Sequence, residues 1–227
     1  MATHGIDGID LETESGASRS TQLVRQVRSA TWLIGAICQW ILDRIVRALS
    51  LSRIHPNALT SLGLVANIGA AVLFGQGRFF EAGLVVMGAG VFDMVDGRVA
   101  RVTNRVTPFG AFFDSVIDRY SDMALYMGLL VYYARNERFF YVVLVAVVMA
   151  GSVMISYSRA RAESLIPSCK VGFLERPERV VLIVIGALWD RMAPVLWIIA
   201  VLSNITVVHR IFYTWQHTRK EPASSRQ

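Results

Sequence analysis

The sequence has little cysteine and histidine, and this scarcity excludes several kinds of site. Its 227 residues include only two cysteines, Cys38 and Cys169, and four histidines, none at the paired spacing of a zinc site. The wide separation of the cysteines favours two free thiols in a reducing compartment, with a disulfide as the alternative. No aromatic and basic motif for RNA or DNA is present, so the net charge of +6 indicates a membrane surface as the partner.

Charged residues are scarce as well. They make up 18% of the chain, whereas 54% of the residues are hydrophobic and the mean hydropathy is +0.45. Several apolar runs approach about 20 residues, the length that a helix needs to cross a hydrocarbon core of about 30 Å. A soluble domain of this length rarely has such a composition. The sequence therefore predicts an all-α integral membrane protein.

The first fifty residues differ from the rest of the chain. Residues 1–20 are acidic and contain no apolar core, so they are not a signal peptide, and we expect a disordered cytoplasmic tail. Residues 21–50 mix arginines with apolar residues and include Trp32 and Trp40. Their uncharged stretch, 30–42, is too short to span a bilayer. We expect a juxtamembrane amphipathic helix on the membrane surface, with a short re-entrant or core helix as the alternative.

Six apolar stretches follow, and they predict a bundle of six transmembrane helices in one domain at 51–216, with a cytoplasmic tail at 217–227. Pro56 favours a helix start at the first stretch, and Pro194 follows the break between the last two. The expected helices cover residues 57–75, 79–101, 109–134, 139–158, 177–189 and 193–213, and the fourth is expected to continue beyond the membrane.

The basic residues orient this bundle. If the N-terminus lies inside the cell, the inner segments hold eighteen of the 23 lysines and arginines. The outer loops hold four, and Arg119 lies within the third helix. This asymmetry follows the positive-inside rule and predicts a multi-pass protein of the plasma membrane with both termini in the cytoplasm.

Four aspartates lie within these membrane helices: Asp93, Asp96, Asp114 and Asp118. A carboxylate in a bilayer is costly and indicates function. Asp93 and Asp96 are three residues apart and Asp114 and Asp118 four apart, so each pair shares a helix face. The hairpin formed by the second and third helices places all four at similar depth, near the cytoplasmic side. Such a cluster needs positive charge, and its oxygen ligands suit Mg²⁺ or Mn²⁺, with two ions forming a clamp for a pyrophosphate.

The alternative is a set of salt bridges that hold the helices together. Their cationic partners would be Arg98, Arg101 and Arg119. Three arginines do not readily neutralise these four acids together with Asp122, which favours the metal site.

The residues between the aspartates extend the pattern. Gly97, Ala100 and Gly110 keep the helix surface small enough for a ligand to approach the backbone, and Arg101 can bind a phosphate. The run DMVDGRVAR at 93–101, with Gly110 and the later aspartates, matches every fixed position of a family signature. The chain thus resembles the CDP-alcohol phosphotransferases, also called CDP-alcohol phosphatidyltransferases.

This resemblance implies a reaction and roles for the residues that match. CDP-diacylglycerol would give its phosphatidyl group to an alcohol and release CMP, with the nucleotide at the cytoplasmic edge. The aspartates Asp93, Asp96 and Asp114 would bind two metal ions, and Asp118 would both contact the second ion and act as the base. The resemblance also implies a homodimer. The CDP-lipid would be bound by Asn57, Thr60, Gly97, Ala100, Arg101 and Gly110.

Two later motifs, ISYSRARAE at 155–163 and ERPER at 175–179, resemble those of phosphatidylinositol-phosphate synthases. They predict a phosphorylated acceptor such as inositol phosphate, because arginine forks grip phosphate oxygens bidentately. The acceptor-binding candidates are Arg159, Arg161, Arg176 and Arg179. Glycerol 3-phosphate, inositol or serine as acceptor, and an archaeal-type lipid as donor, remain alternatives.

Two other functional classes also place aspartates in membrane helices. An intramembrane prenyltransferase binds a pyrophosphate through metal ions, but it normally has a longer bundle and other aspartate spacings. A proton- or cation-coupled transporter would use the carboxylates as a relay, with the acids at the midplane and internal repeats. In this sequence the acids lie toward one edge, and no repeat is visible.

Overall fold

The computed structural model describes residue 44, residues 56–102 and residues 107–220. The chain divides into two compact units, Met1–Arg53 and Ile54–Gln227. In the first unit only Arg44 is described, in a helical conformation, so the expected tail at 1–20 and nearly all of the expected surface helix at 21–50 lie outside the described residues. The second unit is described below.

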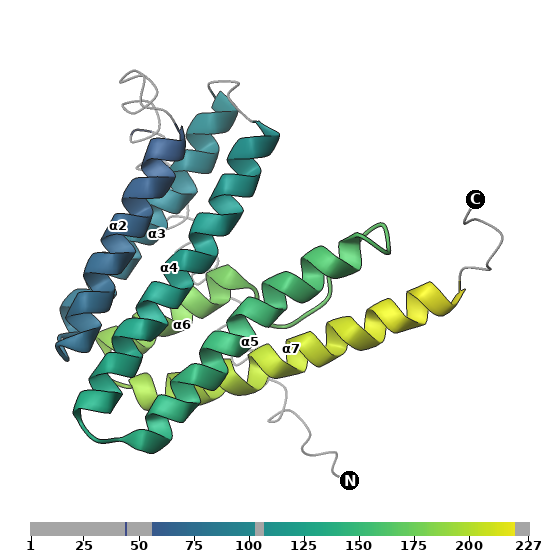
Figure 1. Cartoon of the computed structure of the whole chain (residues 1–227). Coiled ribbons are helices and arrows are strands. Elements are labelled where there is room, and N and C mark those ends of the chain that lie inside the picture. The colour runs from purple at the N-terminus through teal and green to yellow at the C-terminus, as the bar shows by residue number, and fades with distance from the viewer. Residues whose placement is uncertain (1–43, 45–55, 103–106, 221–227) are drawn as a thin grey trace, which may run out of the picture. The chain divides into compact units, whose positions relative to one another are not determined.

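The described part of the second unit is all-helical, and its helices follow the apolar stretches of the sequence (Figure 1). The fourth helix continues past Ser158, as expected. The last helix runs further than expected, past Tyr213, so the expected tail at 217–227 begins inside a helix. The helices are α2 (Pro56–Gly75), α3 (Phe79–Val102), α4 (Pro108–Arg135), α5 (Phe139–Glu163), α6 (Arg176–Leu188) and α7 (Met192–Lys220).

Three of these helices, α2, α5 and α7, are long and apolar enough to cross a membrane. The helices α3 and α4 contain the aspartates, which lower their hydropathy. The helix α6 has 13 residues and is therefore about 20 Å long, shorter than a hydrocarbon core of about 30 Å. By length and composition alone, the described chain thus supports three of the six expected spans.

Local sequence fixes the helix starts nearest to the aspartates. The helix α4 begins with Pro108, and the hydroxyl of its N-cap, Thr107, accepts a hydrogen bond of 3.0 Å from the backbone N–H of Gly110. The helix α6 begins with a capping box in which the side chains of Glu175 and Glu178 each accept from a backbone N–H. These caps fix the first turns of two helices that contribute to the site.

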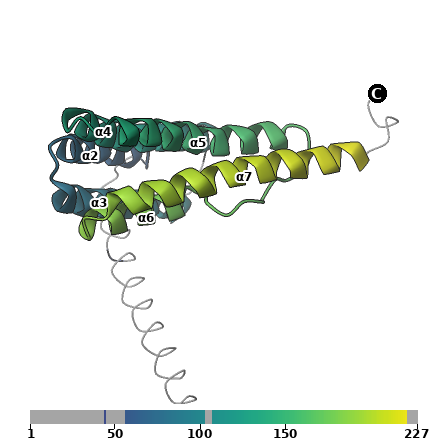
Figure 2. The same ribbon diagram turned by 90° about the horizontal axis from the view of Figure 1, so that it is seen from below.

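The six helices form a closed ring, because each contacts two others in the order α2, α3, α6, α7, α5, α4 and back to α2. Seen from below, α2, α4 and α5 lie in one layer and α3, α6 and α7 in the other (Figure 2). The middle helices of the two layers, α4 and α6, have no Cα atoms within 8 Å of each other. Side chains alone therefore connect these two described helices.

Small residues let α2 and α4, and likewise α3 and α6, pack much more closely than α4 and α6 do. A Cβ built on Gly128 of α4 would overlap the backbone of Ala71 in α2, and one built on Gly83 of α3 would lie 2.9 Å from the Cβ of Ala187 in α6. Such contacts between small residues are typical of membrane helices. The buried core includes Phe74, Leu129 and Leu196, while many large apolar side chains of the outer surface are exposed, as lipid contact requires.

The Gly128 contact yields a test of the packing. We expect Gly128→Ala to destabilise the protein by about 1–3 kcal/mol, because the added methyl group must push α2 away from α4. A Cβ on Gly88 of α3 meets nothing within 4 Å, so Gly88→Ala is the matched control and should leave stability equal or higher. Thermal unfolding in detergent measures both. Equal melting temperatures for the two variants would contradict the proposed close contact.

Candidate functional site

The site lies between α3, α4 and α6, where two of the expected metal ligands meet one cation. The guanidinium of Arg176, the first residue of α6, donates from Nη2 to Oδ2 of Asp93 at 2.8 Å and from Nη1 to Oδ1 of Asp118 at 2.9 Å. Its Nε lies 3.5 Å from Oδ1 of Asp122. The side chains of Asp93 and Asp118 are 21% and 20% exposed, so water screens these ion pairs less than pairs on the surface.

The other expected ligands lie on the same two helices. Asp114 is one turn before Asp118 on α4, close enough to interact electrostatically with Asp93 and Arg176. Asp96 is one turn after Asp93 on α3, but its side chain lies outside the described residues. Asp93, Asp114 and Asp118 are therefore brought together as the hairpin geometry predicts.

The salt-bridge alternative named Arg98, Arg101 and Arg119 as partners of the carboxylates. The structure shows a further arginine in this position, Arg176, which the sequence assigned to the acceptor and which pairs with Asp93 and Asp118. Arg119 instead donates to the backbone carbonyl of Ser115 in its own helix. Arg176 comes from a distant part of the chain, so helix periodicity around the aspartates carried no signal of this pairing.

The carboxylates fit a divalent metal ion by their chemistry. All are oxygen donors, and oxygens of Asp93 and Asp118 already converge on one cation. No three His, Cys, Asp or Glu side chains of the described chain are grouped closely enough to hold a metal ion as they stand. The guanidinium of Arg176 lies between the carboxylates of Asp93 and Asp118. The side chain of Asp96 is outside the described residues.

Gly63 of α2 is a site residue that the sequence interpretation missed. A Cβ built on Gly63 would lie 3.0 Å from Oδ1 of Asp93, closer than ordinary van der Waals contact. The missing side chain therefore makes room for the carboxylate. The only signal in the sequence was a glycine within a helical apolar run, which is common in membrane helices.

The candidate CDP-lipid residues are partly brought together. Oδ1 of Asn57 in α2 would lie 3.6 Å from a Cβ on Gly110, so the start of α2 meets the start of α4. Thr60, one turn after Asn57, is buried. The remaining candidates lie in the last turns of α3, and their side chains are outside the described residues; they are Gly97, Ala100 and Arg101.

The four acceptor candidates divide into two pairs. Arg176 and Arg179 of α6 face the aspartates. Arg159 near the end of α5 pairs with Glu163 and Glu175, each at 3.1 Å. The structure thus does not place all four arginines in one cluster. Arg161 is exposed, and its guanidinium lies 3.5 Å from the hydroxyl of Ser164.

Glu175 connects the two pairs. Besides Arg159, its carboxylate contacts the buried Arg210 of α7 at 3.5 Å. Arg210 also donates from Nε to the carbonyl of Val171 at 2.8 Å and from Nη1 to that of Ile155 at 2.5 Å. These contacts tie α5, α7 and the segment before α6 together, and they position the helix start that carries Arg176.

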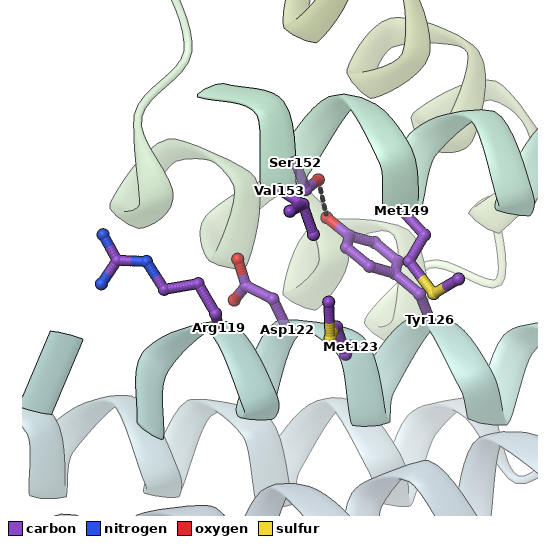
Figure 3. A pocket seen from close by; sticks show the side chains of 7 residues that line it. All are labelled: Arg119, Asp122, Met123, Tyr126, Met149, Ser152 and Val153. Atoms are coloured by element: carbon purple, nitrogen blue, oxygen red, sulfur yellow. Dashed lines mark hydrogen bonds between the residues drawn. The ribbon is translucent and has the colours of Figure 1, made fainter. Parts of the chain in front are cut away.

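A buried polar line continues from the site into the bundle. Nη2 of Arg179 donates to Oδ2 of Asp122 at 2.6 Å, and both side chains are buried. One turn further along α4, the hydroxyl of Tyr126 accepts from Ser152 of α5 at 3.2 Å (Figure 3). Asp122, Tyr126 and Ser152 line, with Arg119, a pocket too narrow for a water molecule. Asp122 was counted among the acids of the sequence but not among the expected site residues, although it extends the 114–118 spacing by one more turn of the helix.

Comparison with known proteins decides the family. The sequence pattern of the CDP-alcohol phosphatidyltransferases matches residues 53–217, which include the site residues described above. This chain belongs to that family. It is therefore a CDP-alcohol phosphatidyltransferase, an enzyme of a metal-dependent family. Its membership excludes the transporter and the prenyltransferase as alternatives.

Curated relatives agree with the narrower resemblance. A phosphatidylinositol phosphate synthase of Mycobacterium marinum is 35% identical over 198 residues, covering 82% of this chain and 84% of the relative. An archaetidylinositol phosphate synthase of Pyrococcus horikoshii is 33% identical over 172 residues, covering 75% of this chain and 89% of the relative.

Solved structures show the same fold. The crystal structure of Mycobacterium tuberculosis phosphatidylinositol phosphate synthase with CDP-DAG bound gives a TM-score of 0.73 at 33% identity, covering 82% of this chain and 98% of that one. The same enzyme with manganese and citrate gives 0.70 at 33% identity, covering 82% and 92%.

The contact between Gly63 and Asp93 gives a test of the carboxylate cluster. We expect Gly63→Ala to weaken Mn²⁺ binding by about tenfold, the equivalent of about 1.4 kcal/mol, because the methyl group displaces the Asp93 carboxylate. Calorimetric titration of the metal-stripped protein measures this affinity. Gly69→Ala, on the same helix with nothing within 4 Å of the new methyl group, should bind like the wild type. If both variants bind Mn²⁺ normally, Asp93 is not a ligand.

Proposed function

We propose that this phosphatidyltransferase transfers the phosphatidyl group of CDP-diacylglycerol to a phosphorylated inositol and releases CMP. The observation that carries the proposal is the approach of two arginines of α6 to the aspartates of α3 and α4. The carboxylates suit metal ions on a pyrophosphate, and the guanidinium groups suit a second phosphate on the acceptor. The names of the relatives support the same acceptor.

The metal ions are Mg²⁺ or Mn²⁺, and we propose two of them. The Mycobacterium tuberculosis relative was crystallised in complex with manganese, which supports a metal of this type. Asp93, Asp96, Asp114 and Asp118 would hold them. When bound, they neutralise the pyrophosphate and make CMP a better leaving group.

Asp118 would be the base. It takes the proton of the acceptor hydroxyl, whose oxygen attacks the lipid-side phosphorus; one phosphorus–oxygen bond forms, and the bond to CMP breaks. A carboxylate that also contacts a metal ion is a weak base, so the hydroxyl must be held in line for the attack. In the structure Asp118 accepts from Nη1 of Arg176 at 2.9 Å.

The donor would lie along the starts of α2 and α4 and the end of α3. Residues with small side chains there let the diphosphate approach the helix backbones, and Arg101 contributes positive charge. The proposed CDP-lipid residues are Asn57, Thr60, Gly97, Ala100, Arg101 and Gly110.

The acceptor would lie on the α6 side of the aspartates. Arg176 and Arg179 are one turn apart and lie next to Asp118 and Asp122. Arg159 and Arg161 would complete the positive rim at the end of α5. An acceptor phosphate held there would leave its hydroxyl within reach of the lipid phosphorus.

In the membrane we propose six spans, with both termini and the site on the cytoplasmic side of the plasma membrane. The excess of basic residues in the inner segments supports this orientation. The short α6 would require the bilayer to thin around it. Two copies would form a homodimer.

Metal dependence separates the roles of the aspartates. Metal-stripped protein should release no CMP until Mg²⁺ or Mn²⁺ is restored.

Asp118→Asn should abolish turnover yet retain more binding of a CDP-lipid analogue than Asp93→Asn, because the main role of Asp118 is as the base. Titration calorimetry in Mg²⁺ compares the two, and equal loss of binding would contradict the assignment. Asp190→Asn is the control, since Asp190 lies in a turn at φ 50°, which asparagine tolerates.

An acceptor panel tests the proposed function directly. With CDP-diacylglycerol as donor, inositol 1-phosphate should give far more lipid product, identified by mass, than inositol, glycerol 3-phosphate or serine. A better yield with any of these would refute the phosphorylated-inositol acceptor and leave the family membership intact.

Arg179 tests the acceptor side of the site. Arg179→Ala should raise the KM for inositol 1-phosphate about tenfold or more and leave the KM for CDP-diacylglycerol nearly unchanged, because it removes a charge from the acceptor side alone. Arg179→Lys keeps the charge beside Asp122 and distinguishes lost binding from lost folding. Arg138→Ala, at an exposed position before α5, is the matched control.

A further inference from the structure

Arg176 is the cation on which the described carboxylates converge. Three of its nitrogens each approach a different aspartate, on two helices of opposite layers. It is also the opening residue of α6, with a long flexible side chain that is 23% exposed. A guanidinium in this position compensates the negative charge of the carboxylates, as a divalent cation would.

Arg176 and a metal ion compete for the same carboxylates. Oδ2 of Asp93 accepts from Nη2 of Arg176 at 2.8 Å, while Oδ1 faces Gly63. Asp118 is held by Nη1 of the same side chain. A divalent ion among these carboxylates would also repel the guanidinium, and the repulsion is stronger where water is partly excluded.

Arg176 has an alternative role close by. Arg179 lies one turn along α6, and its Nε and Nη1 have no hydrogen-bond partner in the described chain although the residue is 2% exposed. Nε of Arg176 also has none. Two neighbouring guanidinium groups with open N–H donors form a receptor for a tetrahedral anion, once one of them is released from the carboxylates.

We propose that Arg176 is a metal-responsive counter-ion: it competes with divalent ions for Asp93 and Asp118, and its displacement by the metal makes it available to the phosphate of the acceptor. The inference rests on the proposed function for the identity of that anion. Metal binding and acceptor binding then reinforce each other by the same factor in both directions, because both favour the released side chain.

The test is the affinity for Mn²⁺ of the metal-stripped, full-length protein in detergent, measured by titration calorimetry. Arg176→Gln should bind Mn²⁺ about tenfold more tightly than the wild type, since the competitor occupies the cluster most of the time. Arg176→Lys should also bind more tightly, because one ammonium cannot contact three carboxylates in place of a guanidinium. Arg78→Gln, which removes the same charge from an exposed pair with Glu81, should bind like the wild type.

Inorganic phosphate supplies the second arm. Its presence should tighten Mn²⁺ binding several-fold in the wild type and leave the affinity of Arg176→Gln unchanged, which separates the linkage from direct contact between phosphate and metal. Unchanged or weaker Mn²⁺ binding in both Arg176 variants, or an equal phosphate effect in wild type and Arg176→Gln, overturns the inference. CMP release with the acceptor panel is measured separately. The proposed acceptor can therefore be refuted while the change in Mn²⁺ affinity is observed, and the change in Mn²⁺ affinity can be absent while the proposed acceptor is used.

Discussion

Compensation of clustered negative charge is the constraint on which the architecture depends. Aspartates on α3 and α4 are gathered inside an apolar bundle, where each unpaired carboxylate would be costly. The protein meets this cost with arginines of α6, and these ion pairs help to join α4 to α6, whose backbones stay apart. The charges needed for function are therefore part of the packing, and the outer helix pairs supply the tight apolar contacts that hold the ring closed.

The segment that leads into α6 shows how far from the aspartates this arrangement is secured. Glu175 belongs at once to a capping box, to an ion pair with Arg159 and to a contact with the buried Arg210. Gly172, at φ 136°, lies against Thr206 and the guanidinium of Arg210, a conformation that side chains rarely adopt. The place where Arg176 leaves the backbone is thus fixed in part by residues of α5 and α7 that contact Glu175, its neighbour in the chain.

Much of the fold was predictable because apolar runs and breaks report helices directly. The spacing of Asp93, Asp114 and Asp118 likewise gave their common location, since helix periodicity and one hairpin suffice. The partner of these residues was not predictable, because Arg176 reaches them only through the packing of α6 against α3. The same helix periodicity could have predicted Asp122 as a site residue, because it lies one turn after Asp118. Gly63 was not, because its importance is the volume that it leaves to a residue on another helix.

The close approach of Gly128 to Ala71 has a mechanical consequence. It makes the α2–α4 edge stiff, since backbone meets backbone there and neither can yield. Across the site, α4 is joined to α6 by the long side chains of Arg176 and Arg179, whose conformations and partners can change without disturbing the close-packed α2–α4 surface. The bundle is thus rigid along one edge and compliant across the site. A change of charge at the aspartates is therefore taken up by these two side chains, while the helix that carries Asp114 and Asp118 stays in register with α2.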